Sequence, residues 1–166
     1  NGRKRNPEMK KGLNHGNAIG LASKKVRYLG DLPANICTPS FLVKEARKIA
    51  SSHSTVSLKV VNEPEMKKLK MGALLSVTAG SVEPSRLIIL SYKGGKSNEK
   101  PIAIVGKGVT FDSGGISLKP GHKMDEMKFD MCGGAAAIGV IQSVADLGLP
   151  INVISIVPAC ENLPSG

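Results

Sequence analysis

Two lysines and two aspartates stand among glycines between residues 107 and 130, in the stretch KGVTFDSGGISLKPGHKMDEMKFD. These residues are Lys107, Asp112, Lys119 and Asp130, and they follow the apolar run 102–105, which is typical of a buried strand. Polar groups at the ends of buried strands commonly line a cleft. Because ammonium and carboxylate groups are costly to remove from water, we expect them to pair or to bind an ion. The stretch is therefore the first candidate for a functional site.

A divalent metal ion is one partner that these groups could share. Carboxylates such as Asp112 and Asp130 are ligands of hard and borderline divalent cations. Lys107 could join them only as a neutral amine, and a nearby dication would lower its pKa enough to release the proton. Lys107 and Asp112 are an odd number of residues apart, so a regular strand would send them to opposite faces. The glycines around them permit a bend that would bring them together.

Spacing leaves other assignments open. Asp125 and Glu126 compete with Asp130 for the second carboxylate position, and Glu126 and Asp130 would share one face of a helix. A simple ion pair between Lys107 and Asp112 beside a turn, with solvated loop around it, explains the same residues without a metal. From the chemistry of the residues alone, the ion pair is the more conservative interpretation.

Other catalytic patterns do not fit the sequence. The glycines after the apolar run fail the pattern G-x-G-x-x-G because position 111 is Phe, and Lys107 is not followed by the Ser or Thr of a P-loop. Ser113 lacks the first glycine of a nucleophile elbow. No H-E-x-x-H zinc motif occurs, and the three histidines are far apart. A thiol pair of Cys132 with His122 is conceivable, but the start of a small-residue helix explains Cys132 as packing.

The chain has 166 residues and an ordinary apolar fraction, which fits one globular domain with an aliphatic core. Its net charge is +10, and residues 1–30 carry +7 of it, with eight basic residues against Glu8. Such a segment could bind nucleic acid, so a basic nucleic-acid-binding or interaction module is the alternative function. Only Tyr28 supplies an aromatic there and no nucleic-acid motif occurs, so a solvated helix face beside an acidic neighbour is preferred.

Cysteine usage and hydropathy indicate the compartment. Three widely spaced cysteines without a C-x-x-C pattern argue against a disulfide scaffold and against a cysteine-ligated zinc site. A reducing cytoplasm fits this usage. No apolar run is long enough to span a membrane, and the first residues lack the apolar core of a signal peptide. The chain begins at Asn1 without a Met, so a preceding segment is conceivable.

Patterning along the chain predicts alternating helices and strands. The segment 10–29 is rich in basic residues and has a thin apolar stripe, which predicts a long helix that ends at Gly30. Thr38 and Pro39 are a cap and a first position for a second helix, and Gly148 closes a third helix over 133–147. Strands are predicted at 56–61, 73–78, 87–90, 102–105 and 151–157, with a short helix from Asn62 to Leu69 that Gly72 stops.

Strands separated by helices indicate an α/β fold with a mixed, largely parallel sheet flanked by helices. The continuous apolar character of 102–105 predicts a strand that is covered on both faces. The sequence ends directly after a core strand, so we expect the domain to continue beyond Gly166. No internal repeat is found.

Two long segments, VGKGVTFDSGGISLKP and MDEMKFDMCGGAAA, resemble the leucine aminopeptidase (cytosol aminopeptidase) family of dinuclear metallo-exopeptidases. DLPANICTPS, MGALLSVTAGS and RLIILSY resemble it upstream, and INVISIVPACENLPSG resembles it downstream. The resemblance covers nearly the whole chain from about Gly30. It implies an incomplete catalytic domain of the zinc-exopeptidase type over residues 31–166, preceded by a basic interdomain linker helix over 1–30.

The resemblance assigns a role to each site residue. It implies that Lys107 is the lysine ligand of one metal, that Asp112 contacts both metals, and that Asp130 is the second aspartate ligand. Lys119 is similar to the catalytic lysine that polarises the scissile carbonyl and stabilises the oxyanion. Met127 corresponds to a residue that lines the pocket for an apolar N-terminal side chain, although core packing explains it equally well.

The resemblance also implies the reaction and the partners. Two divalent ions, zinc or manganese, would activate a water, and one ion would hold the free amine of a peptide substrate. Family members are hexamers and use a bicarbonate base. The second family motif, Asn-Thr-Asp-Ala-Glu-Gly-Arg, does not occur here, so we expect these residues alone to be inactive. A non-catalytic segment with a disordered 107–130 loop is a further alternative.

Overall fold

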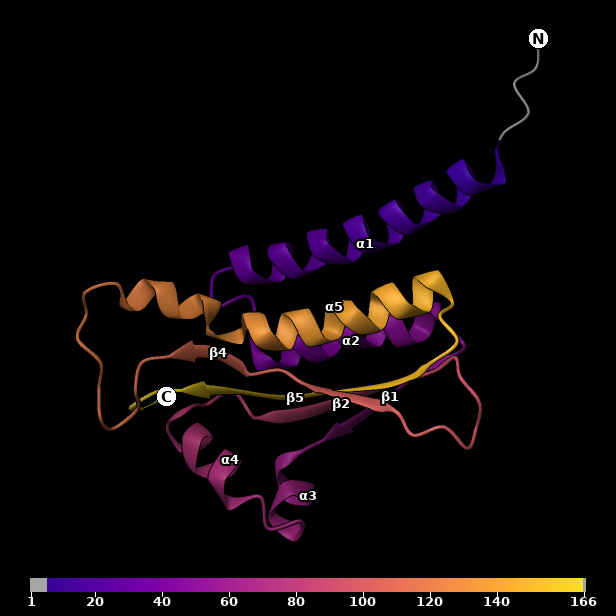
Figure 1. Cartoon of the computed structure of the whole chain (residues 1–166). Helices are drawn as coiled ribbons and strands as arrows, with labels where there is room; N and C mark the ends of the chain where they lie inside the picture. Colours follow the sequence, from indigo (N-terminus) through magenta and orange to yellow (C-terminus); the bar gives the residue numbers. More distant parts are fainter. Residues whose placement is uncertain (1–5, 166) are drawn as a thin grey trace.

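Five strands form one mixed sheet in the computed structural model, which describes residues 6–165 (Figure 1). The helices α2 and α5 cover one face of the sheet, and the short helices α3 and α4 lie on the other. The strands are β1 (Val56–Val61), β2 (Arg86–Lys93), β3 (Ile102–Val105), β4 (Gly108–Asp112) and β5 (Asn152–Asn162).

The strand order places β5 at the centre of the sheet. β2 is antiparallel to β1 on one side and to β5 on the other. β3 and β4 both run parallel to β5, one after the other along its second edge. The prediction of a mixed α/β sheet flanked by helices is therefore confirmed, and the parallel pairs are confined to this edge of β5.

Parallel pairing brings strand ends together. β3 pairs with the first half of β5 up to Val105 opposite Ile156, and β4 continues until Asp112 lies opposite Asn162. The carboxyl ends of β4 and β5 thus meet at one corner of the sheet, where polar side chains commonly gather.

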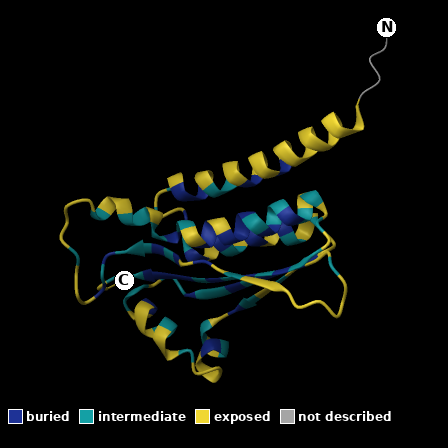
Figure 2. Ribbon diagram, in the orientation of Figure 1, coloured by how far each residue is buried: buried dark blue, intermediate teal, exposed yellow. Residues whose placement is uncertain are grey.

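Two amphipathic helices pack on this sheet. Helix α2 (Pro39–Ser52) begins where the Thr38 hydroxyl accepts a hydrogen bond from the Phe41 N–H, and α5 (Cys132–Leu147) ends at Gly148, whose φ is +59°. Both caps agree with the prediction from sequence. Figure 2 shows the buried residues of the helices and the sheet in dark blue. The core between them is aliphatic, and it includes Leu42, Ala46, Ile49, Ile88, Leu90, Ile138, Ile141 and Val157.

The long helix α1 (Pro7–Asp31) lies over α5, and only its second half is packed (Figures 1 and 2). A Cβ on Gly139 of α5 would clash with Val26, so the missing side chain lets the two helices approach closely. Gly30 lies inside the helix instead of ending it, and a Cβ there would be 3.0 Å from the Cys132 sulfur, so a glycine suits the close contact at this point.

Arg3, Lys4 and Arg5, which contribute to the basic N-terminal segment, lie outside the described residues. Within the described range, the side chains of the first half of α1 are mostly exposed. No helix among residues 6–165 is long and apolar enough to cross a bilayer.

The predicted strand 73–78 is wrong. This segment forms the helix α4 (Gly72–Val77), which continues into a 3-10 turn (Thr78–Gly80). Gly72 begins this helix, because α3 (Glu63–Lys68) has already ended before Lys70, whose φ is +57°. Periodicity cannot separate helix from strand in such a short apolar run, and the segment lies off the sheet, where no ladder partner is available to it.

The prediction that 102–105 forms a strand is correct, but the prediction that this strand is covered on both faces is wrong. Ile102 and Val105 are 56% and 69% exposed, because β3 lies at an edge and the described helices leave its side chains largely open. β5 also extends five residues beyond its predicted end at Val157, and β4 was not predicted as a separate strand. Both differences bear on the site, since they create the corner where it lies.

Candidate active site

Close backbone contact places Lys107 between β3 and the start of α5. The carbonyl oxygen of Lys107 accepts a hydrogen bond of 2.6 Å from the Gly134 N–H. A Cβ on Gly106 would clash with the Gly133 carbonyl, and a Cβ on Gly134 would lie 3.0 Å from the Lys107 oxygen. The glycines on both sides therefore let the helix terminus touch the strand connection directly.

A bulge in β4 changes the alternation of its side chains. Val109 pairs with Cys160 and Phe111 with Glu161, so Thr110 is an extra residue on the β4 side. The bulge offsets the strand alternation by one, so Lys107 and Asp112 need not point to opposite faces. The bend that the sequence required is thus made by Thr110 rather than by glycines alone, and the Thr110 hydroxyl donates to the Cys160 carbonyl at 3.3 Å.

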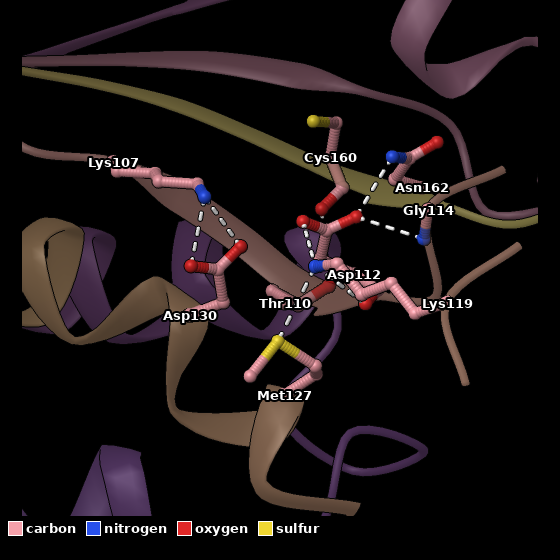
Figure 3. A network of polar contacts seen from close by, with 9 residues as sticks. All are labelled: Lys107, Thr110, Asp112, Gly114, Lys119, Met127, Asp130, Cys160 and Asn162. Atoms are coloured by element: carbon pink, nitrogen blue, oxygen red, sulfur yellow. Dashed lines mark hydrogen bonds and ion pairs between the residues drawn. The ribbon is translucent and has the colours of Figure 1, made fainter. Parts of the chain in front are cut away.

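Asp112 is held on several sides (Figure 3). Its Oδ1 accepts hydrogen bonds from the Asn162 amide at 2.7 Å and from the Gly114 N–H at 3.0 Å, and its Oδ2 lies 2.6 Å from the Lys119 ammonium. Burial alone would raise the pKa of Asp112. The three donors and the positive charge of Lys119 outweigh that effect, so its pKa is lowered and the side chain is a carboxylate.

Asp130 pairs with Lys107 through both of its carboxylate oxygens. It lies in the 3-10 helix η2 (Met124–Met131), and the Lys107 Nζ is 2.8 Å from its Oδ1 and 2.6 Å from its Oδ2. Only the contact with Oδ1 has hydrogen-bond geometry, so the buried Oδ2 receives no hydrogen bond from the described residues and is balanced by the charge of Lys107 alone.

The acidic rivals of Asp130 lie elsewhere. Asp125 and Glu126 are exposed, and Glu126 lies 3.7 Å from Lys123 in a surface ion pair. Asp130 is therefore the carboxylate of η2 that contacts Lys107, a choice that spacing alone could not make; its role as a metal ligand stays a prediction.

Lys119 and Met127 complete the polar network in Figure 3. The Lys119 Nζ donates to the backbone carbonyl of Asp112 at 3.2 Å and contacts the Met127 sulfur at 3.4 Å. The five residues singled out from sequence thus form two neighbouring groups, one of Lys107 with Asp130 and one of Asp112 with Lys119 and Met127. The simple alternative, an ion pair between Lys107 and Asp112, is not the pairing observed.

Cys160 lies beside both groups. The pKa of its thiol is raised to about 11, chiefly by burial; the charges of Asp112, Asp130 and Glu161 contribute to the increase, and that of Lys107 opposes it. All three cysteines are free thiols.

Sequence reasoning missed Asn162, which is the amide donor to Asp112. The predicted strand ends at Val157, so Glu161 and Asn162 lie beyond it, whereas β5 includes both. A usable signal was present, since polar residues that follow the apolar part of a central strand commonly lie at its carboxyl end.

The residues fit a divalent cation as donors. No three His, Cys, Asp or Glu residues gather into a metal-binding group in the described part of the chain. The donor set has to include the Lys107 amine beside Asp112 and Asp130. Carboxylate oxygens suit hard and borderline divalent ions, and the buried Oδ2 of Asp130 receives no hydrogen bond from the described residues.

Comparison with known proteins decides the family. Residues 24–166 match the sequence profile of the cytosol aminopeptidase family, catalytic domain. The chain belongs to this family. A probable cytosol aminopeptidase of Nitrosococcus oceani is 51% identical over 164 residues, which cover 99% of this chain and 33% of that protein. A probable cytosol aminopeptidase of Cupriavidus taiwanensis is 52% identical, covering 91% of this chain and 29% of that protein.

Solved structures of similar proteins share the fold. The bottromycin maturation enzyme BotP in complex with Mn superposes with a TM-score of 0.86 at 35% identity, covering 97% of this chain and 34% of that one. A tomato leucine aminopeptidase variant gives a TM-score of 0.82 at 35% identity, covering 95% and 30%. The 166 residues span about a third of the length of the curated relatives they match.

Proposed function

We propose that this protein is a dinuclear metallo-aminopeptidase that releases N-terminal, preferably apolar, residues from peptides by metal-activated water. The observation that carries the proposal is the meeting of two lysine–aspartate pairs at one corner of the sheet, where a buried carboxylate oxygen of Asp130 receives no hydrogen bond from the described residues. Membership of the cytosol aminopeptidase family supports the reaction class.

The first step of the proposal concerns the metal ligands. Lys107, as a neutral amine, would hold one ion together with the carboxylates of Asp112 and Asp130, and Asp112 would contact both ions. Two divalent ions, zinc or manganese, would lower the pKa of a shared water and hold the free amine of the substrate. Manganese is compatible with this donor set, and the similar BotP structure is a complex with Mn.

The second step concerns the catalytic side chain. Lys119 carries a positive charge that Asp112 and the Met127 sulfur hold in place. We assign it to the scissile carbonyl, where an ammonium would stabilise the negative charge that develops on the oxygen. Met127 is half-buried beside it, and we assign its side chain to the pocket for an apolar N-terminal residue.

Further parts of the proposal concern the whole protein. The motif with the remaining Asp and Glu ligands and the arginine for a bicarbonate base does not occur in these 166 residues, so the whole protein would supply them elsewhere. We propose a cytoplasmic homo-hexamer acting on peptides. We also propose that residues 1–30 link a preceding domain to the catalytic domain that begins at residue 31.

Metal binding and Leu-amide hydrolysis test the proposal. Both are measured for the polypeptide 1–166 and for one extended with the sequence that follows it in a relative. We expect hydrolysis only by the extended polypeptide, and only with manganese or zinc. Activity of the polypeptide 1–166 alone, or of the extended polypeptide after Asp112→Ala, would show that the assignment of ligands is wrong.

A further inference from the structure

We infer that Asn162 is a positioning residue, which fixes the direction in which the Asp112 carboxylate faces the proposed metal site. The inference rests on the proposed function, because it gives Asn162 a role only through the assignment of Asp112 as a ligand. Its basis is a set of contacts at the carboxyl end of β5 that sequence reasoning did not anticipate.

Asn162 holds the turn after β4 by its backbone as well as by its side chain. Its carbonyl oxygen accepts two hydrogen bonds from Ser113, one from the N–H at 2.9 Å and one from the hydroxyl at 2.7 Å. Its side-chain amide donates to Oδ1 of Asp112 at 2.7 Å. The two ends of this one residue therefore contact successive residues of the turn, which limits the movement of Asp112.

Glycine makes this arrangement possible. Gly115 has a φ of +65°, and a Cβ there would lie 2.5 Å from the Asn162 Oδ1. The Asn162 amide therefore lies against bare backbone on one side and against a carboxylate on the other. Since an ionised carboxylate only accepts hydrogen bonds, the NH₂ group has to face Asp112.

Residues on the opposite face hold the end of β5. The neighbouring Glu161 is buried on that face, where the Ser81 hydroxyl donates to its Oε2 at 2.6 Å. Strand alternation then directs Asn162 to the face that carries Cys160 and the site. The amide is thus presented by a strand end that is fixed from both sides.

These contacts fix the orientation of the Asp112 carboxylate. Its Oδ1 is held by two amide donors, Gly114 and Asn162, so the carboxylate cannot rotate freely, and its Oδ2 is turned toward Lys119. Residues that orient a metal-binding carboxylate in this way typically contribute about 10- to 100-fold to metal affinity. We therefore expect the loss of the Asn162 amide to weaken metal binding without unfolding the chain.

The test measures Mn²⁺ affinity by calorimetry in the chelator-treated full-length protein, and the unfolding midpoint by circular dichroism. Asn162→Ala is expected to weaken Mn²⁺ binding by about 10- to 100-fold. Ser113→Ala is the matched control, because it removes a hydrogen bond to the same residue and leaves the amide in place. We expect its Mn²⁺ affinity to stay within about threefold of the wild type, since the first contact shell of Asp112 is unchanged.

Wild-type Mn²⁺ affinity in Asn162→Ala, or an equal loss in Ser113→Ala, overturns the inference. If Asn162→Ala lowers the unfolding midpoint strongly, Asn162→Leu, which keeps more volume but has no donor, replaces it and is judged by the same criterion. Asp112→Ala separates the two hypotheses. Unchanged Mn²⁺ affinity in that variant refutes the proposed function itself, whereas a loss there with no loss in the Asn162 variants refutes only the positioning role.

Discussion

Lysines meet buried carboxylates in two parts of this molecule, and the two clusters are built differently. In the helix cluster, Glu45 of α2 lies 2.5 Å from Lys48 and 3.7 Å from Lys25 of α1. Glu45 is 5% exposed, and both of its partners are lysines with long, flexible side chains. The cluster joins two helices, and charge balance between side chains is sufficient to explain it.

The site cluster of Lys107, Asp112, Lys119 and Asp130 depends on backbone instead. Asp112 accepts hydrogen bonds from a backbone N–H and from a side-chain amide, and it also pairs with its lysine. Close contacts between Gly106 and the start of α5 fix the backbone position from which the Lys107 side chain extends. One buried oxygen of Asp130 receives no hydrogen bond from the described residues.

The comparison of the two clusters indicates that a lysine–carboxylate pair can serve either packing or chemistry, depending on how the carboxylate is held. A carboxylate that only joins helices can be satisfied by mobile lysines. A carboxylate that has to present its oxygens in a fixed direction needs rigid donors, which strand ends and glycine turns supply. We therefore expect variants of the site cluster to affect activity more than stability, and variants of the helix cluster to do the reverse.

The largest effect is expected for Asp112→Asn. The substitution keeps the shape but removes the charge, and it places an amide against donors that need an acceptor. We expect kcat/KM for Leu-amide to fall at least about 1,000-fold in the full-length protein, because Asp112 is proposed to contact both metal ions and its loss would disrupt the whole site. Glu45→Gln is the matched control from the helix cluster, with kcat/KM expected within about twofold of the wild type. A decrease of less than tenfold for Asp112→Asn contradicts the comparison.

Lys119→Met is expected to have the next largest effect. It keeps the length of the side chain and removes the charge proposed to stabilise the developing oxyanion, so kcat should fall about 100- to 1,000-fold. Mn²⁺ affinity should not weaken, because Lys119 is not a proposed ligand. Lys107→Met is the control with the opposite pattern, in which Mn²⁺ affinity itself decreases. Calorimetry with steady-state kinetics distinguishes them, and a loss of affinity in Lys119→Met would remove the distinction between the two lysines.

Much of this organisation could be predicted from the sequence. Periodicity and caps located α1, α2, β1, β2 and α5, because each is long or has a clear boundary such as Thr38 or Gly148. The prediction of a strand over 73–78 is wrong, since this apolar run is too short for periodicity to decide between strand and helix. The bulge at Thr110 and the extension of β5 to Asn162 depend on pairing between distant segments. No local pattern carries that information.

The site shows the same division. The identities of Lys107, Asp112, Lys119 and Asp130 were predictable from a long family resemblance, and their contacts agree with those choices. Spacing alone could not select Asp130 over Asp125, because the selection is made by which residue of η2 faces the turn before β4. The roles of these residues as ligands and catalyst remain predictions that the variants above test.

Glu45→Gln is expected to act on stability. The charge of a nearly fully buried carboxylate and its hydrogen bond from Lys48 are lost, so the free energy of unfolding should fall by about 1–2 kcal/mol. The matched control is Glu65→Gln, which breaks the exposed ion pair with Lys59 and should stay within about 0.5 kcal/mol of the wild type. Urea titration measures both. Equal effects of the two substitutions would mean that Glu45 contributes nothing beyond a surface pair.

The smallest expected effect is on the thiol of Cys37, which lies next to the helix cluster. Its pKa is raised to about 11, chiefly by burial, with smaller contributions from negative charge at Cys132 and Glu45. Because the folded pKa is above the ordinary value of 9.0, the neutral thiol stabilises the fold fully below pH 9, and this contribution is lost as the pH rises towards 11. Labelling is therefore done at pH 8.5, where the protein stays folded.

Iodoacetamide labelling followed by mass spectrometry reports the thiolate fraction of each cysteine. In the wild type, Cys37 and Cys160 should both react at least about tenfold more slowly than in the urea-unfolded chain, since only the thiolate reacts. Glu45→Gln removes a negative charge near Cys37, which lowers the pKa of this thiol and should speed its labelling by about twofold. Cys160 is the internal control, because its surrounding charges belong to the site cluster. Equal acceleration of both thiols would indicate general loosening of the fold, and the two clusters would then not be electrostatically separate.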